Sequence, residues 1–275
     1  MLALYGNSED SIVPVISSEP EPGIVTVSID YPPVNALPVQ GWFDLAQAVT
    51  RAGANPATRV VVLRAENRGF CAGVDIKEIE NYSGYEHLIG ANKGCAAAFS
   101  AVYDCEVPVI AAVQGFCLGG GIGLVGNADV VVASDDATFG VPEVDRGALG
   151  AATHLSRLVP QHLMRTLYYT ARRIDAKALE HFGSVYEVVP RAELDESALR
   201  VARDIAAKDT RVIRAAKEAL NGIDIQPVHR SYRFEQGFTF ELNLSGAADE
   251  ARRSSLDNNF RTSEHQDHRG KGGHA

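Results

Sequence analysis

The chain has 275 residues, of which 45% are hydrophobic and 22% are charged, enough to build one sizeable core. Its net charge of -9 argues against a nucleic-acid partner, because proteins that bind the phosphate backbone need a basic face. No apolar run approaches the roughly 20 residues that span a bilayer, and residues 1–10 lack the basic and apolar parts of a signal peptide. We therefore predict a globular, cytoplasmic protein with no membrane contact.

The first half of the chain alternates between strand and helix patterns. Residues 23–30 predict a strand, residues 39–53 a helix, and residues 59–65 an apolar run too short for a helix and therefore a buried strand. The next predicted elements are a helix at 85–105, a strand at 107–113, a short helix at 118–127 and a strand at 128–134. This order predicts an α/β fold with parallel strand pairing.

Beyond about residue 151 the pattern becomes mainly helical. The predicted helices cover residues 151–170, 175–182, 194–207, 212–221 and 229–244, with one strand at 184–189. We predict an α/β core over residues 1–200, a C-terminal helical region over 201–261, and a tail over 262–275 that is too polar to pack and therefore disordered.

The four cysteines, Cys71, Cys95, Cys105 and Cys117, form no CxxC pair and lie in or beside apolar stretches. This pattern is typical of reduced, packed thiols and not of disulfides or zinc ligands. We expect neither a metal nor a redox cofactor.

A glycine-rich segment follows the strand at 107–113. Gly121, Gly123 and Gly126 fit the dinucleotide pattern G-x-G-x-x-G, but the gap to Asp135 is shorter than the roughly 20 residues that this pattern requires. Three consecutive glycines at the start of a helix instead let a ligand approach unpaired backbone N–H groups. The segment therefore favours one half of an oxyanion site.

The other half is predicted at residues 69–78. Ala72 and Gly73 form a tight turn there, from which the amide of Val74 can point inward. Each stretch alone is also compatible with an ordinary turn.

These two stretches resemble the signature turns of the crotonase, or enoyl-CoA hydratase/isomerase, superfamily. Similar segments occur in the family's order at residues 32–37, 59–78, 107–124, 128–150 and 181–189. The resemblance implies a spiral of ββα units with a C-terminal helical trimerisation region, assembled as a homotrimer or a dimer of trimers. It also implies that the N–H groups of Val74 and Gly120 polarise the thioester carbonyl of an acyl-CoA.

The same resemblance implies a path for coenzyme A, which enters as part of the substrate. It places the pantetheine beside Ala36 and Leu37, and the adenine among Ala72, Asp75 and Ile76. Either Lys77 or Arg68 could meet a phosphate, and each is equally well interpreted as a solvated surface charge.

One catalytic position departs from the hydratase pattern. Hydratases of this family use two glutamates; this chain has the second, Glu143 in FGVPE, but Gly123 at the position of the first. Glycine cannot transfer a proton, so hydration by two carboxylates is in doubt. We expect the missing side chain to enlarge the pocket for a bulkier acyl group.

Asp145 is a second candidate acid or base. It shares the pocket with Glu143 if the loop curls, points away if the loop is extended, and could instead pair with Arg146 or Arg172 on the surface.

Two further polar residues lie in helical segments. His154 and Tyr232 are better interpreted as packed core residues than as catalysts, although either could line the pocket.

Longer similarity, at residues 119–134, 142–165 and 202–220, is to actinobacterial family members that open a ring of a bicyclic, steroid-derived keto-acyl-CoA by hydrolysis. This implies a retro-Claisen cleavage in which Glu143, alone or together with Asp145, activates water and the released electrons reach the thioester carbonyl. The alternatives are an enoyl-CoA hydratase or isomerase that works with one glutamate, and a non-catalytic acyl-CoA-binding protein.

Overall fold

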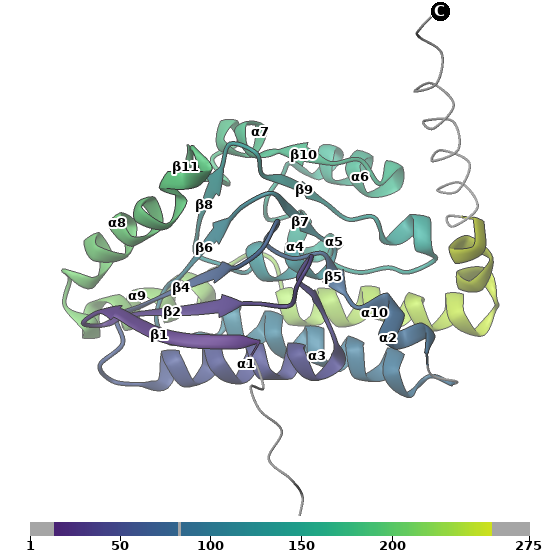
Figure 1. Cartoon of the computed structure of the whole chain (residues 1–275), viewed down its shortest axis with the longest axis horizontal. Helices are drawn as coiled ribbons and strands as arrows, with labels where there is room; N and C mark the ends of the chain where they lie inside the picture. Colours follow the sequence, from purple (N-terminus) through teal and green to yellow (C-terminus); the bar gives the residue numbers. More distant parts are fainter. Residues whose placement is uncertain (1–13, 82–83, 255–275) are drawn as a thin grey trace, which may run out of the picture.

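The computed structural model describes residues 14–81 and 84–254, and Figure 1 shows a twisted sheet with helices packed against it. Within these residues the main sheet has the strand order β1-β2-β4-β6-β8-β11. β1 pairs antiparallel with β2, and the other neighbours are parallel. The strands are β1 (Val15–Glu21), β2 (Ile24–Ile29), β4 (Val60–Ala65), β6 (Val109–Val113), β8 (Val130–Ser134) and β11 (Glu187–Val189).

The central strands are buried on both faces, as their uninterrupted apolar sequences predict. In β4, Val61 and Leu63 pack into the larger core together with residues of α1 and α3. Val60 and Val62 point to the opposite face and pack against α8, because successive residues of a strand alternate in direction. The three covering helices are α1 (Val39–Ala54), α3 (Glu86–Tyr103) and α8 (Leu194–Ala206).

Two small sheets carry the glycine-rich turns away from the main sheet. β7 (Phe116–Leu118) pairs with β9 (Thr138–Gly140), which also pairs with β10 (Ile174–Asp175). β3 (Ala36–Leu37) pairs with β5 (Gly73–Val74). An isolated bridge between Cys71 and Cys117 joins the two small sheets, so the two turns predicted to form an oxyanion site lie side by side.

The remaining helices lie between and after these strands in the chain. α10 runs along α3 and α5, as Figure 1 shows for α3. These helices are α2 (Ile76–Glu80), α4 (Gly120–Val125), η1 (Glu143–Arg146), α5 (Ala152–Leu155), α6 (Gln161–Thr170), α7 (Ala176–His181), η2 (Arg191–Glu193), α9 (Thr210–Gly222) and α10 (Val228–Leu244).

The structure confirms the α/β class, the predicted strands and most predicted helices. The single helix predicted at 151–170 is wrong: the segment forms α5 and α6, because Pro160 cannot continue a helix and instead precedes the first turn of α6. Sequence reasoning also missed β1, an edge strand whose side chains are mostly exposed. The proposed core and helical region stay a prediction, and residues 262–275 lie outside the described part of the chain.

Two other expectations concern side chains and membranes. Cys71, Cys95, Cys105 and Cys117 are buried free thiols, as predicted. In the described ranges, no helix has both the length and the hydropathy needed to cross a bilayer.

Candidate active site

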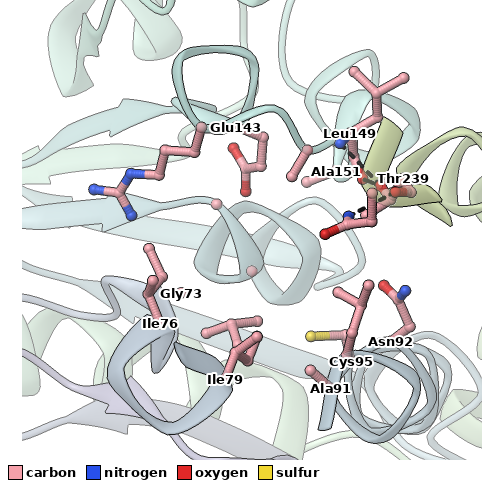
Figure 2. Close-up of a pocket in the computed structure, with 18 of the residues that line it drawn as sticks. Gly73, Ile76, Ile79, Ala91, Asn92, Cys95, Glu143, Leu149, Ala151 and Thr239 are labelled. Carbon is pink, nitrogen blue, oxygen red and sulfur yellow. Dashed lines mark hydrogen bonds between the residues drawn. The ribbon is translucent and has the colours of Figure 1, made fainter. Parts of the chain in front are cut away.

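A cavity of about 560 Å³ opens between α3, the two glycine-rich turns and α10. Figure 2 shows Glu143 on one wall, and Ala91, Asn92 and Cys95 of α3 on the facing wall. The predicted residues Val74, Gly120 and Glu143 all line this cavity. The structure thus brings together residues that lie up to 69 positions apart in the sequence.

The direction of the Val74 amide follows from the pairing of β5. The N–H of Asp75 donates to the carbonyl of Leu37 (2.9 Å), toward β3. Successive N–H groups along a parallel strand point to opposite sides, so the N–H of Val74 points away from β3. On that side lies α4: a Cβ added to Gly73 would be 3.2 Å from the nitrogen of Gly120.

Gly120 begins α4, where the first N–H groups of a helix have no partner within the helix. The preceding Gly119 has a φ of 54°, a conformation that L residues rarely adopt, and this lets the chain turn sharply into α4. A Cβ on Gly120 would be 2.6 Å from the ring of Trp42, so only glycine fits there. The indole of Trp42 is fixed by donating to the Leu37 carbonyl (3.1 Å).

Glu143 presents its carboxyl group to this turn. A side chain at Gly119 would overlap Oε1 of Glu143, so the carboxyl lies directly over the start of α4. Its Oε2 is buried and has no hydrogen-bond partner among the described residues. Burial raises the pKa of Glu143 to about 8; the nearby Arg146 opposes this rise, and Glu235 adds to it. A carboxylate in such a site is a stronger base than one in water.

The absence of a side chain at Gly123 does not enlarge the cavity, and our expectation on this point was wrong. A Cβ at Gly123 would overlap the ring of Phe99, so Phe99 fills the space of the missing glutamate. Phe99 is 2% exposed and packs edge-on against Trp42, with ring centroids 5.7 Å apart. An aromatic wall therefore stands where the hydratase pattern has its first carboxylate.

Asp145 does not join Glu143. The loop curls into the short helix η1, and Asp145 is exposed there, outside the set of described residues that line the cavity. A curled loop was the geometry expected to bring both carboxylates into the pocket. It separates them instead, because residues two apart on a 3₁₀ helix point in different directions.

Of the residues predicted near the pantetheine, neither Ala36 nor Leu37 is among the described residues that line the cavity. Leu37 is fully buried, and its carbonyl already accepts hydrogen bonds from Trp42 and Asp75. Ala36 is half-buried on β3, where it pairs with Gly73.

Around the predicted adenine position, Ala72 and Ile76 line the cavity. The carboxylate of Asp75 caps α2 by accepting from the N–H of Lys77 (3.0 Å). Lys77 and Arg68 are both exposed, as a phosphate contact would require. These coenzyme A contacts stay predictions.

His154 and Tyr232 are packed as predicted. His154 is 0% exposed and lies edge-on to Phe99 and Tyr232, with ring centroids 4.9 Å away in both cases. Burial lowers the pKa of His154 to about 3, so the ring is neutral. Tyr232 is buried too and lines the cavity.

Sequence reasoning missed the polar stripe that α10 turns toward the loop after Glu143. Oε2 of Glu235 accepts from the N–H groups of Ala152 (3.0 Å) and Thr153 (3.3 Å). Burial raises the pKa of Glu235 to about 7, while these hydrogen bonds oppose the rise. The sequence could have predicted this polar stripe, because Glu235, Thr239 and Asn243 are spaced four apart and therefore share one helix face.

Thr239 holds the same loop. Its hydroxyl donates to the carbonyl of Leu149 (2.7 Å) and accepts from the N–H of Leu149 (3.0 Å), as the dashed lines in Figure 2 show. The loop that forms one wall of the cavity is therefore fixed by side chains of α10.

Known proteins resemble this chain along most of its length. The enoyl-CoA hydratase/isomerase family matches residues 19–242. A Mycobacterium tuberculosis protein named (7aS)-7a-methyl-1,5-dioxo-2,3,5,6,7,7a-hexahydro-1H-indene-carboxyl-CoA hydrolase is 73% identical, over 87% of this chain and 97% of that protein. A Rhodococcus jostii protein of the same name is 71% identical, over 84% of this chain and 89% of that protein. A solved enoyl-CoA hydratase from Bacillus anthracis has a TM-score of 0.72 at 27% identity, over 86% of this chain and 96% of that one.

Proposed function

This chain belongs to the enoyl-CoA hydratase/isomerase family, and we propose that it hydrolyses a carbon–carbon bond in the ring system of a dioxo-hexahydro-indene-carboxyl-CoA. The proposed substrate is supported by two hydrolases named for that thioester, to which this chain is 73% and 71% identical. That this acyl group derives from a steroid is part of the proposal.

Glu143 is the general base of the proposed reaction. Its ionised carboxylate removes a proton from water while the water oxygen bonds to the carbon of a ring ketone. The ring carbon–carbon bond then breaks, and the ketone carbon becomes a carboxylic acid. The proton held by Glu143 is available to the carbon that was bonded to the ketone carbon. Water is consumed, and the thioester to coenzyme A stays intact.

The N–H groups of Val74 and Gly120 stabilise the negative charge that forms when the bond breaks. The electron pair of the bond delocalises onto the thioester oxygen as an enolate, which the two backbone N–H groups stabilise. Two fixed donors in a water-poor site lower the energy of such an anion by several kcal/mol, about 3 for each donor in known oxyanion holes. The steps use groups of this chain and the coenzyme A thioester, with no other cofactor.

A single observation favours this chemistry over hydration of a double bond. Delivering water across a double bond in the hydratase pattern takes two carboxylates, and the ring of Phe99 occupies the place of the first at Gly123. Ring hydrolysis needs one base, which Glu143 supplies, and one electron sink, which is the thioester carbonyl stabilised by the two backbone N–H groups. A non-catalytic acyl-CoA-binding protein would not need the buried carboxyl of Glu143, whose burial is costly.

We also propose that the protein assembles as a homotrimer or a dimer of trimers and acts in the cytoplasm. Exposed apolar side chains support the assembly, since Ile225, Phe234 and Leu244 lie at or near α10 with most of their surface open to solvent.

The proposal is tested by incubating the wild-type protein with the bicyclic dioxo thioester and, separately, with crotonyl-CoA. Acid release from the bicyclic thioester, without release of free thiol, is the expected result. Loss of the crotonyl double bond without acid release would return the protein to the hydratases, and free thiol would indicate thioester hydrolysis.

A further inference from the structure

Asn92 carries an unpaired hydrogen-bond donor in the wall of the cavity. It lies on α3 opposite Glu143, in the wall that Figure 2 shows with Ala91 and Cys95. Its Nδ2 is buried, and no described residue offers it an acceptor. A buried donor that no protein acceptor meets is unfavourable, so the site is suited to a ligand that brings an acceptor.

The orientation of this amide is fixed by a chain of hydrogen bonds that starts at Arg233. A guanidinium can only donate hydrogen bonds. The side-chain atom of Gln236 that Arg233 contacts must therefore be the acceptor Oε1, which lies 2.7 Å from Nη1 of Arg233. Nε2 of Gln236 therefore points toward Asn92. It donates to the backbone carbonyl of Asn92 (2.9 Å) and to the side-chain Oδ1 of Asn92 (3.3 Å). Oδ1 of Asn92 is therefore the bound acceptor, and Nδ2 is the group left over.

We propose that Nδ2 of Asn92 donates a hydrogen bond to a ring oxo oxygen of the acyl group and thereby selects keto-acyl thioesters. This inference rests on the proposed function and names the group that recognises its substrate. The acyl group in the relatives' name carries two oxo oxygens, both neutral acceptors, whereas a plain enoyl chain has none. The hydroxyl of Thr239, across the cavity, already donates to the carbonyl of Leu149 and accepts from its N–H, so its proton is not available to the acyl group.

The test uses Asn92→Asp, which is nearly isosteric, keeps an acceptor for Gln236 and removes the donor. Asn92→Leu is the second variant. The dissociation constant of each variant is measured for the dioxo thioester and for the two analogues in which one oxo group is replaced by CH₂, because the analogue without the attacked ketone cannot be hydrolysed. We expect the affinity for the dioxo thioester to fall about tenfold to hundredfold, and the affinity for one of the two analogues to stay nearly unchanged.

The matched control is Asn243→Leu. Asn243 also lines the cavity, but its Nδ2 already donates to the carbonyl of Thr239 (2.7 Å), so its loss should affect all three thioesters equally. Equal losses on all three thioesters for the Asn92 variants, or no loss, would overturn the inference. If the wild type does not turn over the dioxo thioester, the proposed function fails, and the affinity ratios still test this inference.

Discussion

The ring of Phe99 occupies the space that a side chain at Gly123 would fill. Phe99 is anchored by edge-on contacts with Trp42 and His154 and so cannot easily turn aside. This packing distinguishes the chain from hydratases that use two carboxylates, and it agrees with the proposal that Glu143 is the one general base.

A glutamate introduced at Gly123 should destabilise the fold and add no hydratase activity. Overpacking a core costs about 1–3 kcal/mol, and here a buried carboxylate is added as well. We expect G123E to melt at a lower temperature than the wild type in calorimetry. In a double-mutant cycle with F99A, the two losses should be less than additive, since F99A makes room. Full additivity would contradict direct contact between the two positions.

Replacing Glu143 by glutamine should remove turnover and keep binding. A general base contributes typically about 10²–10⁴-fold to a rate, and E143Q has the same size without the ability to accept the proton. We expect kcat to fall by at least this factor, while calorimetry shows an unchanged dissociation constant for the CoA thioester. Wild-type turnover by E143Q would remove Glu143 from the mechanism.

Asp145 serves as the internal comparison for Glu143. Because Asp145 is exposed and faces away from the cavity, D145N should change kcat/KM by less than about twofold, in line with surface substitutions. Steady-state kinetics on the same thioester measures this. A loss comparable to that of E143Q would show that the loop rearranges when substrate binds.

The activity should rise with pH. Since Glu143 must be ionised to act as a base and burial raises its pKa to about 8, kcat/KM should increase up to about pH 8 and then level off. A profile that is already flat above pH 5 would mean an unshifted carboxyl.

The same shift predicts an opposite trend in stability. Between the unfolded pKa near 4.5 and the folded value near 8, the folded state holds a proton that the unfolded state has lost. The free energy of unfolding should therefore decrease as pH rises through this window, with Glu235 contributing in the same direction up to about 7. E143Q should show a shallower decrease in denaturant titrations, and an identical slope would contradict the assignment.

A methyl group at Gly120 should weaken the oxyanion site. The new Cβ would meet the ring of Trp42 and shift the first turn of α4, which carries the Gly120 N–H. Removing one oxyanion donor costs about 10²–10³-fold in kcat. We expect G120A to show a loss of this order in kcat, with affinity for free coenzyme A unchanged, and G237A, at an open position, to behave as the wild type.

Much of the site's backbone could be predicted from the sequence. Glycines at a helix start and in a tight turn indicate backbone donors whatever surrounds them, so the local pattern and the family resemblance together could predict Val74 and Gly120 as donors. Both turns then proved to line one cavity.

The side chains that complete the site could not be predicted in the same way. Phe99 meets Gly123 only because α3 packs against α4, a contact that no local pattern encodes. The direction of Asp145 depends on the curl of η1, and the donor on Asn92 is oriented by residues of α10 that lie about 140 positions away. Such features depend on tertiary packing and become visible only in the folded chain.

The most direct test of the central claim is turnover of the dioxo thioester in H₂¹⁸O, followed by mass spectrometry of the product. We predict one ¹⁸O atom in a new carboxyl group and an intact coenzyme A thioester. Two results would contradict hydrolysis of the ring carbon–carbon bond. One is label in a hydroxyl group of an unopened ring. The other is free coenzyme A together with label in the carboxyl group that the thioester formed before its cleavage.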